Sequence, residues 1–390
     1  MTPGARRRRR TTIWPVAALL VAIALLVACS DPTGHPPAPG PPAGPLVGAA
    51  ASSSRAAELE AGLTSALVER VYATAAARTA ATQDRPTSVG GTLDRGSQAL
   101  AELLGAYDKT SDPLASALRQ VDGLQVMDAR AAGTPDAAAV RTRLVQAQRD
   151  LAAGVRRAVP SLSFEQILDR LLPDLDAQLA AAGAAPYDGL HIASLRARET
   201  ARVLAAAVAE TRRLGPAGTR AAALRADLTG LLTEHVLLTG ALAGELGDGG
   251  RLAAGAASAR GALEANTRSL TEVIGVSYPA AAEPFGAAWS RHVTQLEARA
   301  AEEAAAGVPG PREQDAQAEL ARLFAAPVAG LPVDRLAAEL TPLLDAQVQA
   351  MATAARRAPE AAADLRVTVG RVPVPAALVA AGIAQHLRLS

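Results

Sequence analysis

Apolar residues recur at intervals of three and four along almost the whole chain from Arg55 onward, and Gly or Pro separates one run from the next. This spacing is that of the buried stripe of an α-helix. Two runs show it well: Leu63, Leu67 and Val71, and later Leu228, Leu231, Leu232 and Val236. Since no pair of segments alternates in the manner of β-strands, the pattern predicts an all-α fold.

The helical part of the chain also repeats itself after about 170 residues, which is the sequence signature of a duplicated unit. Residues 63–71 match residues 228–236, Pro113-Leu114 matches Pro284-Phe285, and residues 159–178 match residues 328–347. The order of the matches is preserved. We therefore predict two tandem helical bundles, over residues 56–214 and 217–388, of about four or five helices each. In an alanine-rich chain, coincidence of composition is the alternative explanation.

Two prolines of the matching blocks, Pro173 and Pro342, fall inside helical patterns. We expect them at the first turn of a helix or at a kink, where the missing N–H is tolerated. The apolar run from Val372 to Leu387 is too short to cross a bilayer comfortably and predicts a closing helix.

The N-terminus has the pattern of an export signal. Five arginines, Arg6–Arg10, precede an apolar run over residues 13–28, and the run ends in Leu26-Val27-Ala28-Cys29. This ending resembles the lipobox of bacterial lipoproteins, and Cys29 is the only cysteine of the chain. The resemblance implies that residues 1–28 are removed and that the Cys29 thiol is acylated. An ordinary signal peptide or a single-span anchor is the alternative.

Residues 29–55 are rich in Pro, Gly, Ala and Ser, so they predict a semi-extended tether that follows the lipidated cysteine. Acyl chains would then hold the protein at the outer face of the cell membrane. A membrane is accordingly the first partner that the sequence predicts.

Composition narrows the classes further. Hydrophobic residues make up 49% of the chain and aromatic residues only 2%, which favours helix over sheet. A single cysteine excludes a disulfide framework and a cysteine-based zinc site. The formal net charge of +1 argues against a nucleic-acid binder.

Candidate chemistry centres on two histidines of the second predicted unit, His235 and His292. If their helices face each other, the imidazoles could meet inside the bundle, and Glu272 or Glu234 could complete a site for zinc, copper, iron or haem. Glu234 and His235, however, are consecutive and point about 100° apart on a helix. The alternative is that both histidines are half-buried polar residues beside a packing seam.

Asn266, Arg268 and Glu272 form a polar stripe on one predicted helix. The simplest expectation is a solvated face, but an asparagine inside a helix can also signal a hydrogen bond across a seam. Trp289 follows Phe285 by four residues, and this spacing predicts core packing of the two rings.

The second predicted unit resembles a group of uncharacterised exported helical-bundle proteins of bacteria. The resemblance covers residues 220–390 and rests on Glu234-His235-Val236, Asn266, Ile274-Gly275 with Tyr278, and Trp289 with His292. It implies a helical fold and an extracytoplasmic compartment but no activity. Further histidines of that group are replaced here by Gln347 and Arg366, which weakens a shared metal site.

Taken together, the sequence predicts a non-enzymatic lipoprotein of the cell envelope whose helical body binds a protein partner or a small ligand. The alternative is a metal- or haem-binding bundle for redox chemistry, storage or sensing. A structural spacer is a third, simpler possibility.

Overall fold

The computed structural model describes residues 48–83, 89–105, 111–169, 186–247, 253–306 and 333–389. Across these ranges every regular element is a helix and no strand occurs, so the predicted all-α fold is confirmed. The predicted signal segment 1–28, Cys29 and most of the tether lie outside the described residues. The described residues belong to one compact unit, which contains both predicted bundles.

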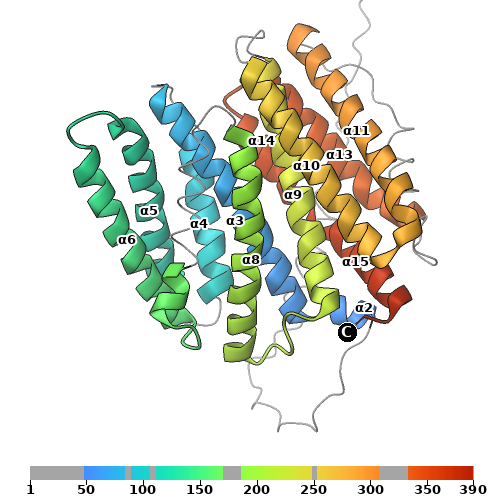
Figure 1. The fold of residues 1–390 in the computed structure, drawn as a ribbon, viewed down its shortest axis with the longest axis horizontal. Helices are drawn as coiled ribbons and strands as arrows, with labels where there is room; N and C mark the ends of the chain where they lie inside the picture. Colours follow the sequence, from blue (N-terminus) through green and yellow to red (C-terminus); the bar gives the residue numbers. More distant parts are fainter. Residues whose placement is uncertain are drawn as a thin grey trace, which may run out of the picture. The chain divides into compact units, whose positions relative to one another are not determined.

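The helices follow one another in chain order and are labelled in Figure 1. Their bounds are α2 Ala49–Ser52, α3 Arg55–Thr82, α4 Val89–Gly105, α5 Ser111–Ala131, α6 Ala137–Ala158, α8 Pro186–Arg212, α9 Arg220–Leu246, α10 Ala253–Ser277, α11 Pro279–Ala306, α13 Val333–Ala355, α14 Ala361–Val369 and α15 Pro373–Leu387.

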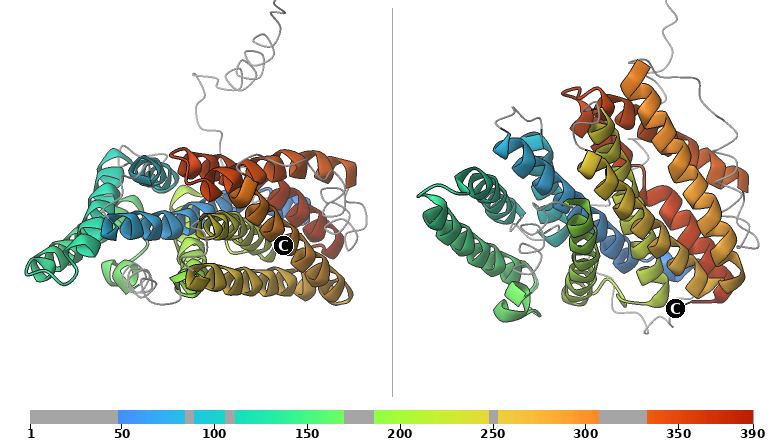
Figure 2. Two further views of the ribbon diagram at one scale, coloured as in Figure 1. Left: turned by 90° about the horizontal axis from the view of Figure 1, so that it is seen from above. Right: turned by 45° about the horizontal axis from the view of Figure 1, so that its top comes forward.

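Helix α9 is the central element. It packs against α3, α8, α10, α11, α13, α14 and α15, and most of its residues are buried, including the predicted stripe of Leu228, Leu231, Leu232 and Val236. A helix that is apolar all round must be enclosed on every side. Figures 1 and 2 show the enclosure, with α3 and α8 on one side of α9 and α10, α11, α13 and α15 on the other.

The α5–α6 hairpin lies at the far end of the row of helices, next to α4 and α3 (Figure 1). Its own core contains Leu118, Leu144 and Leu151. A second core surrounds α9, α13 and α15, where Leu228 and Ile383 are fully buried. The ligand-site candidates described below all lie around α9, away from the α5–α6 hairpin.

The body begins earlier than the predicted tether boundary at residue 55. Residues 49–52 already form α2, and the Gly48 amide donates to the Leu389 carbonyl at 2.7 Å. Ala51 is buried against the core that contains α15. The short α2 therefore ties the start of the body to its C-terminal end, where both lie side by side in Figure 1.

The first helices of the two predicted units begin in the same way. The Ser54 hydroxyl accepts from the Ala57 amide and caps α3, and the Thr219 hydroxyl accepts from the Ala222 amide and caps α9, with the same backbone angles at both caps. In each half the first helix also packs on the second and third. These parallels are those that a duplication would leave, and the duplication itself stays a prediction.

Of the two positions predicted for Pro342, the first turn of a helix or a kink, the structure excludes the first turn. Pro342 lies well inside α13 instead of in its first turn, and Pro284 lies inside α11. Pro173 lies outside the described residues.

The C-terminal run forms α15, the predicted closing helix. By length and composition alone, the combined stretch Ala361–Leu387 could cross a membrane, and it is the single such stretch among the described residues. Half of its most apolar window is buried inside the body. Since Val379 and Ile383 belong to the core around α9, the apolar character of α15 is explained by packing.

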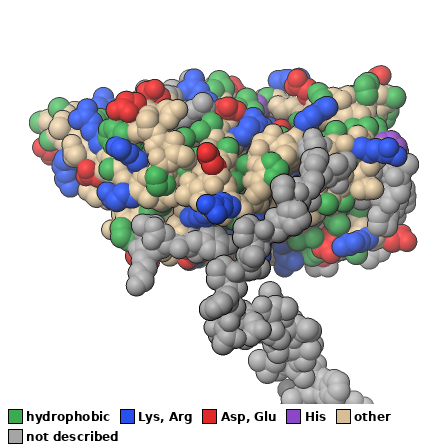
Figure 3. All heavy atoms as spheres, turned by 90° about the horizontal axis from the view of Figure 1, so that it is seen from below, with side chains coloured by type: hydrophobic (Ala, Val, Ile, Leu, Met, Phe, Trp, Pro, Cys, Tyr) green, Lys and Arg blue, Asp and Glu red, His purple; other side chains and the backbone are tan. Residues whose placement is uncertain are grey.

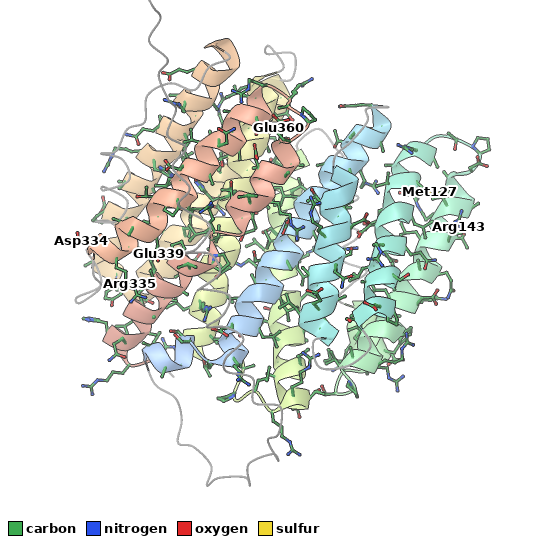
Figure 4. All side chains as sticks on the ribbon, turned by 180° about the vertical axis from the view of Figure 1, so that it is seen from behind. Met127, Arg143, Asp334, Arg335, Glu339 and Glu360 are labelled. Carbon is green, nitrogen blue, oxygen red and sulfur yellow. The ribbon has the colours of Figure 1, made fainter. Side chains whose placement is uncertain are left out.

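Charged residues cover the outside of α13. Figure 4 shows Asp334, Arg335 and Glu339 on the outer side of this helix, while Leu340 and Leu344 of the same helix are buried. Side chains of both charge signs are also mixed with apolar ones on the face seen in Figure 3. Helix α13 is therefore amphipathic, and its apolar face closes one side of the site.

Candidate functional site

Two polar clusters are buried around α9, and each contains one of two consecutive residues of that helix, Glu234 and His235. Glu234 faces α3, α8 and α10, whereas His235 faces α11 and α13. The split follows from helix geometry, because consecutive side chains point about 100° apart. The sequence argument that Glu234 and His235 do not share one site agrees with this arrangement.

Glu234 is the acceptor of the first cluster and is 0% exposed. Its Oε1 accepts from the Tyr72 hydroxyl at 3.0 Å and lies 3.1 Å from Nδ1 of His191. Its Oε2 accepts from Nδ2 of Asn266 at 2.9 Å, and the same amide donates to the Leu231 carbonyl at 3.0 Å. The carboxylate thus joins α3, α8, α9 and α10, and both of its oxygens are occupied.

Burial raises the pKa of the Tyr72 hydroxyl well above its usual range, and the charge of Glu234 and the hydrogen bond to it act in the same direction. Tyr72 is therefore a fixed donor at neutral pH. Removing a donor from a buried carboxylate is strongly destabilising, because it leaves the buried charge without compensation. This cluster therefore holds helices of the two predicted units together, and we call it the polar clamp; it joins α3 and α8 of the first unit to α9 and α10 of the second.

Asn266 corrects the expectation of a solvated stripe. It is 0% exposed and bonds across the α9–α10 seam, while Arg268 and Glu272 on the same helix are exposed. The stripe therefore divides, with one residue buried and two in solvent. The alternative explanation, a cross-seam hydrogen bond of the asparagine, is the correct one for this residue.

The second cluster brings together three rings that the sequence singled out. The ring centroids of His235 and His292 are 5.6 Å apart, and Trp289 lies 4.9 Å from His235 and 5.3 Å from His292. Phe285 stacks on Trp289 at 5.8 Å, so the predicted aromatic pair packs in the core. The two helices of the histidines, α9 and α11, do face each other.

A small cavity adjoins these rings. Its volume is about 20 Å³, and it lies between α9, α11 and α13. The lining consists of Leu232, His235, Val236, Trp289, His292, Leu340, Leu343, Leu344 and Gln347. A cavity of this size holds one water molecule or one ion.

His235 faces this cavity with its hydrogen-bonding capacity unused. The residue is 2% exposed, and within the described part of the chain neither Nδ1 nor Nε2 has a hydrogen-bond partner. The amide of Gln347, the other polar group of the lining on α13, donates to the Thr239 hydroxyl at 2.9 Å. Buried polar atoms are usually paired, so the two nitrogens of His235 are open to a partner beyond the described residues, such as a water molecule or an ion.

The electrostatics keep both imidazoles neutral. Burial lowers the pKa of His235 well below its usual range, and the neighbouring His292 lowers it further. Burial also lowers the pKa of His292 to about 4. A neutral imidazole has a nitrogen lone pair free for a proton donor or a metal ion.

Glu272 does not join this pair, which corrects the predicted three-residue set. Its side chain is exposed on α10, where it lines an open groove of about 590 Å³ between α10 and α11. Among the described residues no group of three or more His, Cys, Asp or Glu is placed to hold a metal ion. Haem does not fit the cavity beside the histidines, because the cavity has room for a single small species.

The groove itself is mostly apolar. Its floor is formed by small residues, including Gly275, Ala282 and Gly286. The Thr271 hydroxyl donates to the Thr267 carbonyl and the Ser290 hydroxyl donates to the Gly286 carbonyl, so both hydroxyls are bound to their own helices. The polar groups that the groove presents to solvent are therefore mainly the charged side chains of Arg268 and Glu272.

Sequence reasoning missed Tyr72, His191 and Gln347 as members of the two clusters. Tyr72 and His191 come from helices α3 and α8, far from Glu234 in the sequence, so no local spacing connects them. His386 lies in the last turn of α15, and its ring centroid is 5.4 Å from that of Tyr278.

The fold and site define an all-α protein with a buried histidine pair beside an ion-sized cavity. No protein-family model, curated protein or solved structure matches the chain. The resemblance to exported helical-bundle proteins therefore stays a prediction.

Proposed function

We propose that the protein is a lipid-anchored lipoprotein of the cell envelope and that its helical body is a binding module for a small ligand. The anchor is Cys29, at the end of the predicted signal segment. The ligand site is the cavity that His235 and His292 line between α9, α11 and α13. One observation carries the ligand part, namely the two buried nitrogens of His235 without a partner.

The character of the cavity sets the class of ligand. Its polar lining groups are two neutral imidazoles, an indole and an amide, and its volume of about 20 Å³ admits one ion or one molecule of the size of water. An organic substrate needs a far larger pocket of about 300–1,000 Å³. The site therefore supports binding of a metal ion better than catalysis on a metabolite, and binding of a protein partner stays a separate prediction.

The placement is tested by labelling cells with a palmitate analogue. We expect the full-length protein to carry the label and to sediment with membranes, and Cys29→Ala to lose both properties because the thiol is the acylated atom. Ser30→Ala is the matched control and keeps the label. Labelling that survives in Cys29→Ala refutes the anchor.

The binding function is tested separately with the full-length protein in detergent. The protein is dialysed against first-row transition-metal ions one at a time, and bound metal is measured by elemental analysis. We expect at least one ion to bind with one equivalent per chain and His235→Gln to remove it, because imidazole nitrogens suit these ions. His386→Gln, a histidine change away from the cavity, is the control. If no ion binds in a manner that depends on His235, the binding function is refuted.

A further inference from the structure

We propose that the ion bound between His235 and His292 is a single copper(I) ion. This inference rests on the proposed binding function and names the ligand of the same site. The argument uses the charge of the lining, the number of ligands and the surrounding side chains.

Among the residues that the structure describes, the lining offers no negative charge. Its nine residues are aliphatic, aromatic or uncharged polar side chains at neutral pH. Glu234 precedes His235 in the chain, but its two oxygens accept from Tyr72, His191 and Asn266 on other helices. Because the cost of burying an ion grows with the square of its charge, a monovalent cation is far cheaper here than a divalent one.

The number of ligands points to the same ion. Zinc sites in proteins use three or four protein ligands in a tetrahedral arrangement, whereas this cavity presents two imidazoles. Copper(I), a closed-shell monovalent ion, accepts two nitrogen ligands in a nearly linear arrangement. With a metal–nitrogen distance of about 2.0 Å, two imidazoles that share such an ion have ring centroids about 6 Å apart. The centroids of His235 and His292 are 5.6 Å apart, so the rings must move apart by a few tenths of an ångström to share such an ion in a linear arrangement.

The remaining side chains suit a soft, poorly hydrated cation. Leu232, Val236, Leu340, Leu343 and Leu344 make most of the cavity lining apolar. Trp289 packs against both histidine rings, so a cation between them lies within reach of the indole face. A dry shell of this kind also disfavours oxidation of the ion, since copper(II) prefers more ligands and a square-planar geometry.

Trp289 supplies a local reporter. The chain has two tryptophans, and the other one, Trp14, lies in the predicted signal segment. In a full-length Trp14→Phe protein, indole emission therefore comes from Trp289 alone. Binding of copper(I) beside it should quench this emission.

The experiment titrates copper(I) under anaerobic conditions into the full-length Trp14→Phe protein, in competition with a chromophoric copper(I) chelator. Zinc(II) and cobalt(II) are titrated in parallel. We expect one equivalent of copper(I), quenching that saturates at that point, and an affinity for copper(I) about 100-fold or more above that for zinc(II). His235→Gln and His292→Gln should each weaken binding by more than the about 10- to 100-fold that changes outside the first ligand shell cost. His386→Gln is the control and should bind as the parent does.

A further variant distinguishes loss of a ligand from misfolding, should the glutamine variants not bind. His292→Met replaces an imidazole with a thioether, a ligand that selects copper(I) and not zinc(II). We expect it to keep copper(I) affinity within about tenfold and to lose zinc(II) binding.

Three outcomes overturn the assignment. If zinc(II) or cobalt(II) binds at least as tightly as copper(I), with the same dependence on His235, the copper assignment fails and the binding function stands. If no ion binds in a manner that depends on His235, in the chelator competition or in the Trp289 emission, both fail. If copper(I) binds at several equivalents and the histidine variants bind as the parent does, the ion is held at other places on the protein and the assignment fails.

Discussion

Asn266 offers the most direct test of the polar clamp around Glu234. Replacing it with alanine removes a hydrogen bond to the Glu234 carboxylate and another to the Leu231 carbonyl, and both groups are buried. A hydrogen bond to a charged group contributes about 1.5–3 kcal/mol and one to a neutral group about 0.5–1.5 kcal/mol. We therefore expect Asn266→Ala to lower the free energy of unfolding by about 3 kcal/mol.

A double-mutant cycle separates this contact from general damage to the core. Glu234→Gln keeps the shape of the acceptor and removes its charge, and the double variant completes the cycle. Because the two side chains bond directly, the coupling free energy should be about 1–3 kcal/mol. The assay is denaturant unfolding of the full-length protein, followed by far-UV circular dichroism.

Arg268→Ala is the matched control on α10, since Arg268 is exposed two residues further along. It should change the free energy of unfolding by no more than about 0.5 kcal/mol. A loss below about 1 kcal/mol for Asn266→Ala, or additive effects in the cycle, would show that the Asn266–Glu234 bond does not hold α9 and α10 together.

Three further predictions concern other buried contacts. Burial lowers the pKa of His292 from 6.5 to about 4, so on acidification the unfolded chain binds the proton before the folded protein does. The metal-free protein should therefore lose about 3 kcal/mol of its free energy of unfolding between pH 6.5 and pH 4. His292→Phe should flatten this dependence of the free energy of unfolding on pH. An unchanged slope would refute the assignment of a neutral buried imidazole. Gly230→Ala should destabilise the protein by about 1–2 kcal/mol in thermal unfolding, because the added Cβ would lie 2.7 Å from Cγ2 of Thr64 on α3. A gain in stability would show that α3 and α9 pack less closely there than the structure has them. Asp122→Asn should lower the free energy of unfolding by about 3–5 kcal/mol in denaturant unfolding. The Arg70 guanidinium lies 2.6 Å from the Asp122 carboxylate and would lose its counter-charge. An unchanged free energy of unfolding would mean that water solvates this ion pair.

The helices were predictable because their signal is local. The stripe of Leu228, Leu231, Leu232 and Val236 repeats at helical spacing, and all four residues are buried in α9. The start of the body was not predictable in the same way, because α2 has four residues of Ala and Ser and is held by contacts with the far end of the chain. Local composition there favours a linker, and tertiary packing overrides it.

The site was predictable in part. The sequence predicted that His235 and His292 would meet if their helices faced each other; the helices do, and the ring centroids are 5.6 Å apart. Glu272 was assigned to the same site although it lies six residues beyond Asn266, about 120° around the helix. Once Asn266 faces α9, Glu272 must face solvent, as it does. The donors Tyr72 and His191 gave no signal, because only the folded chain brings them to Glu234.

The two clusters around α9 differ in what they require. Every oxygen of Glu234 has a donor within the chain, so that cluster is explained by the fold alone, as a device that sets the rotation of α9 against α3, α8 and α10. Because His235 follows Glu234 directly, the rotation of α9 that places Glu234 also sets the direction of the His235 side chain. Neither of the buried nitrogens of His235 has a partner in the described part of the chain. A helix that served packing alone would carry a leucine at this position, because an aliphatic side chain fills a dry cavity without the cost of an unpaired polar group. The Glu234 cluster therefore positions His235, and the two unpaired imidazole nitrogens are what a bound ligand explains and packing does not.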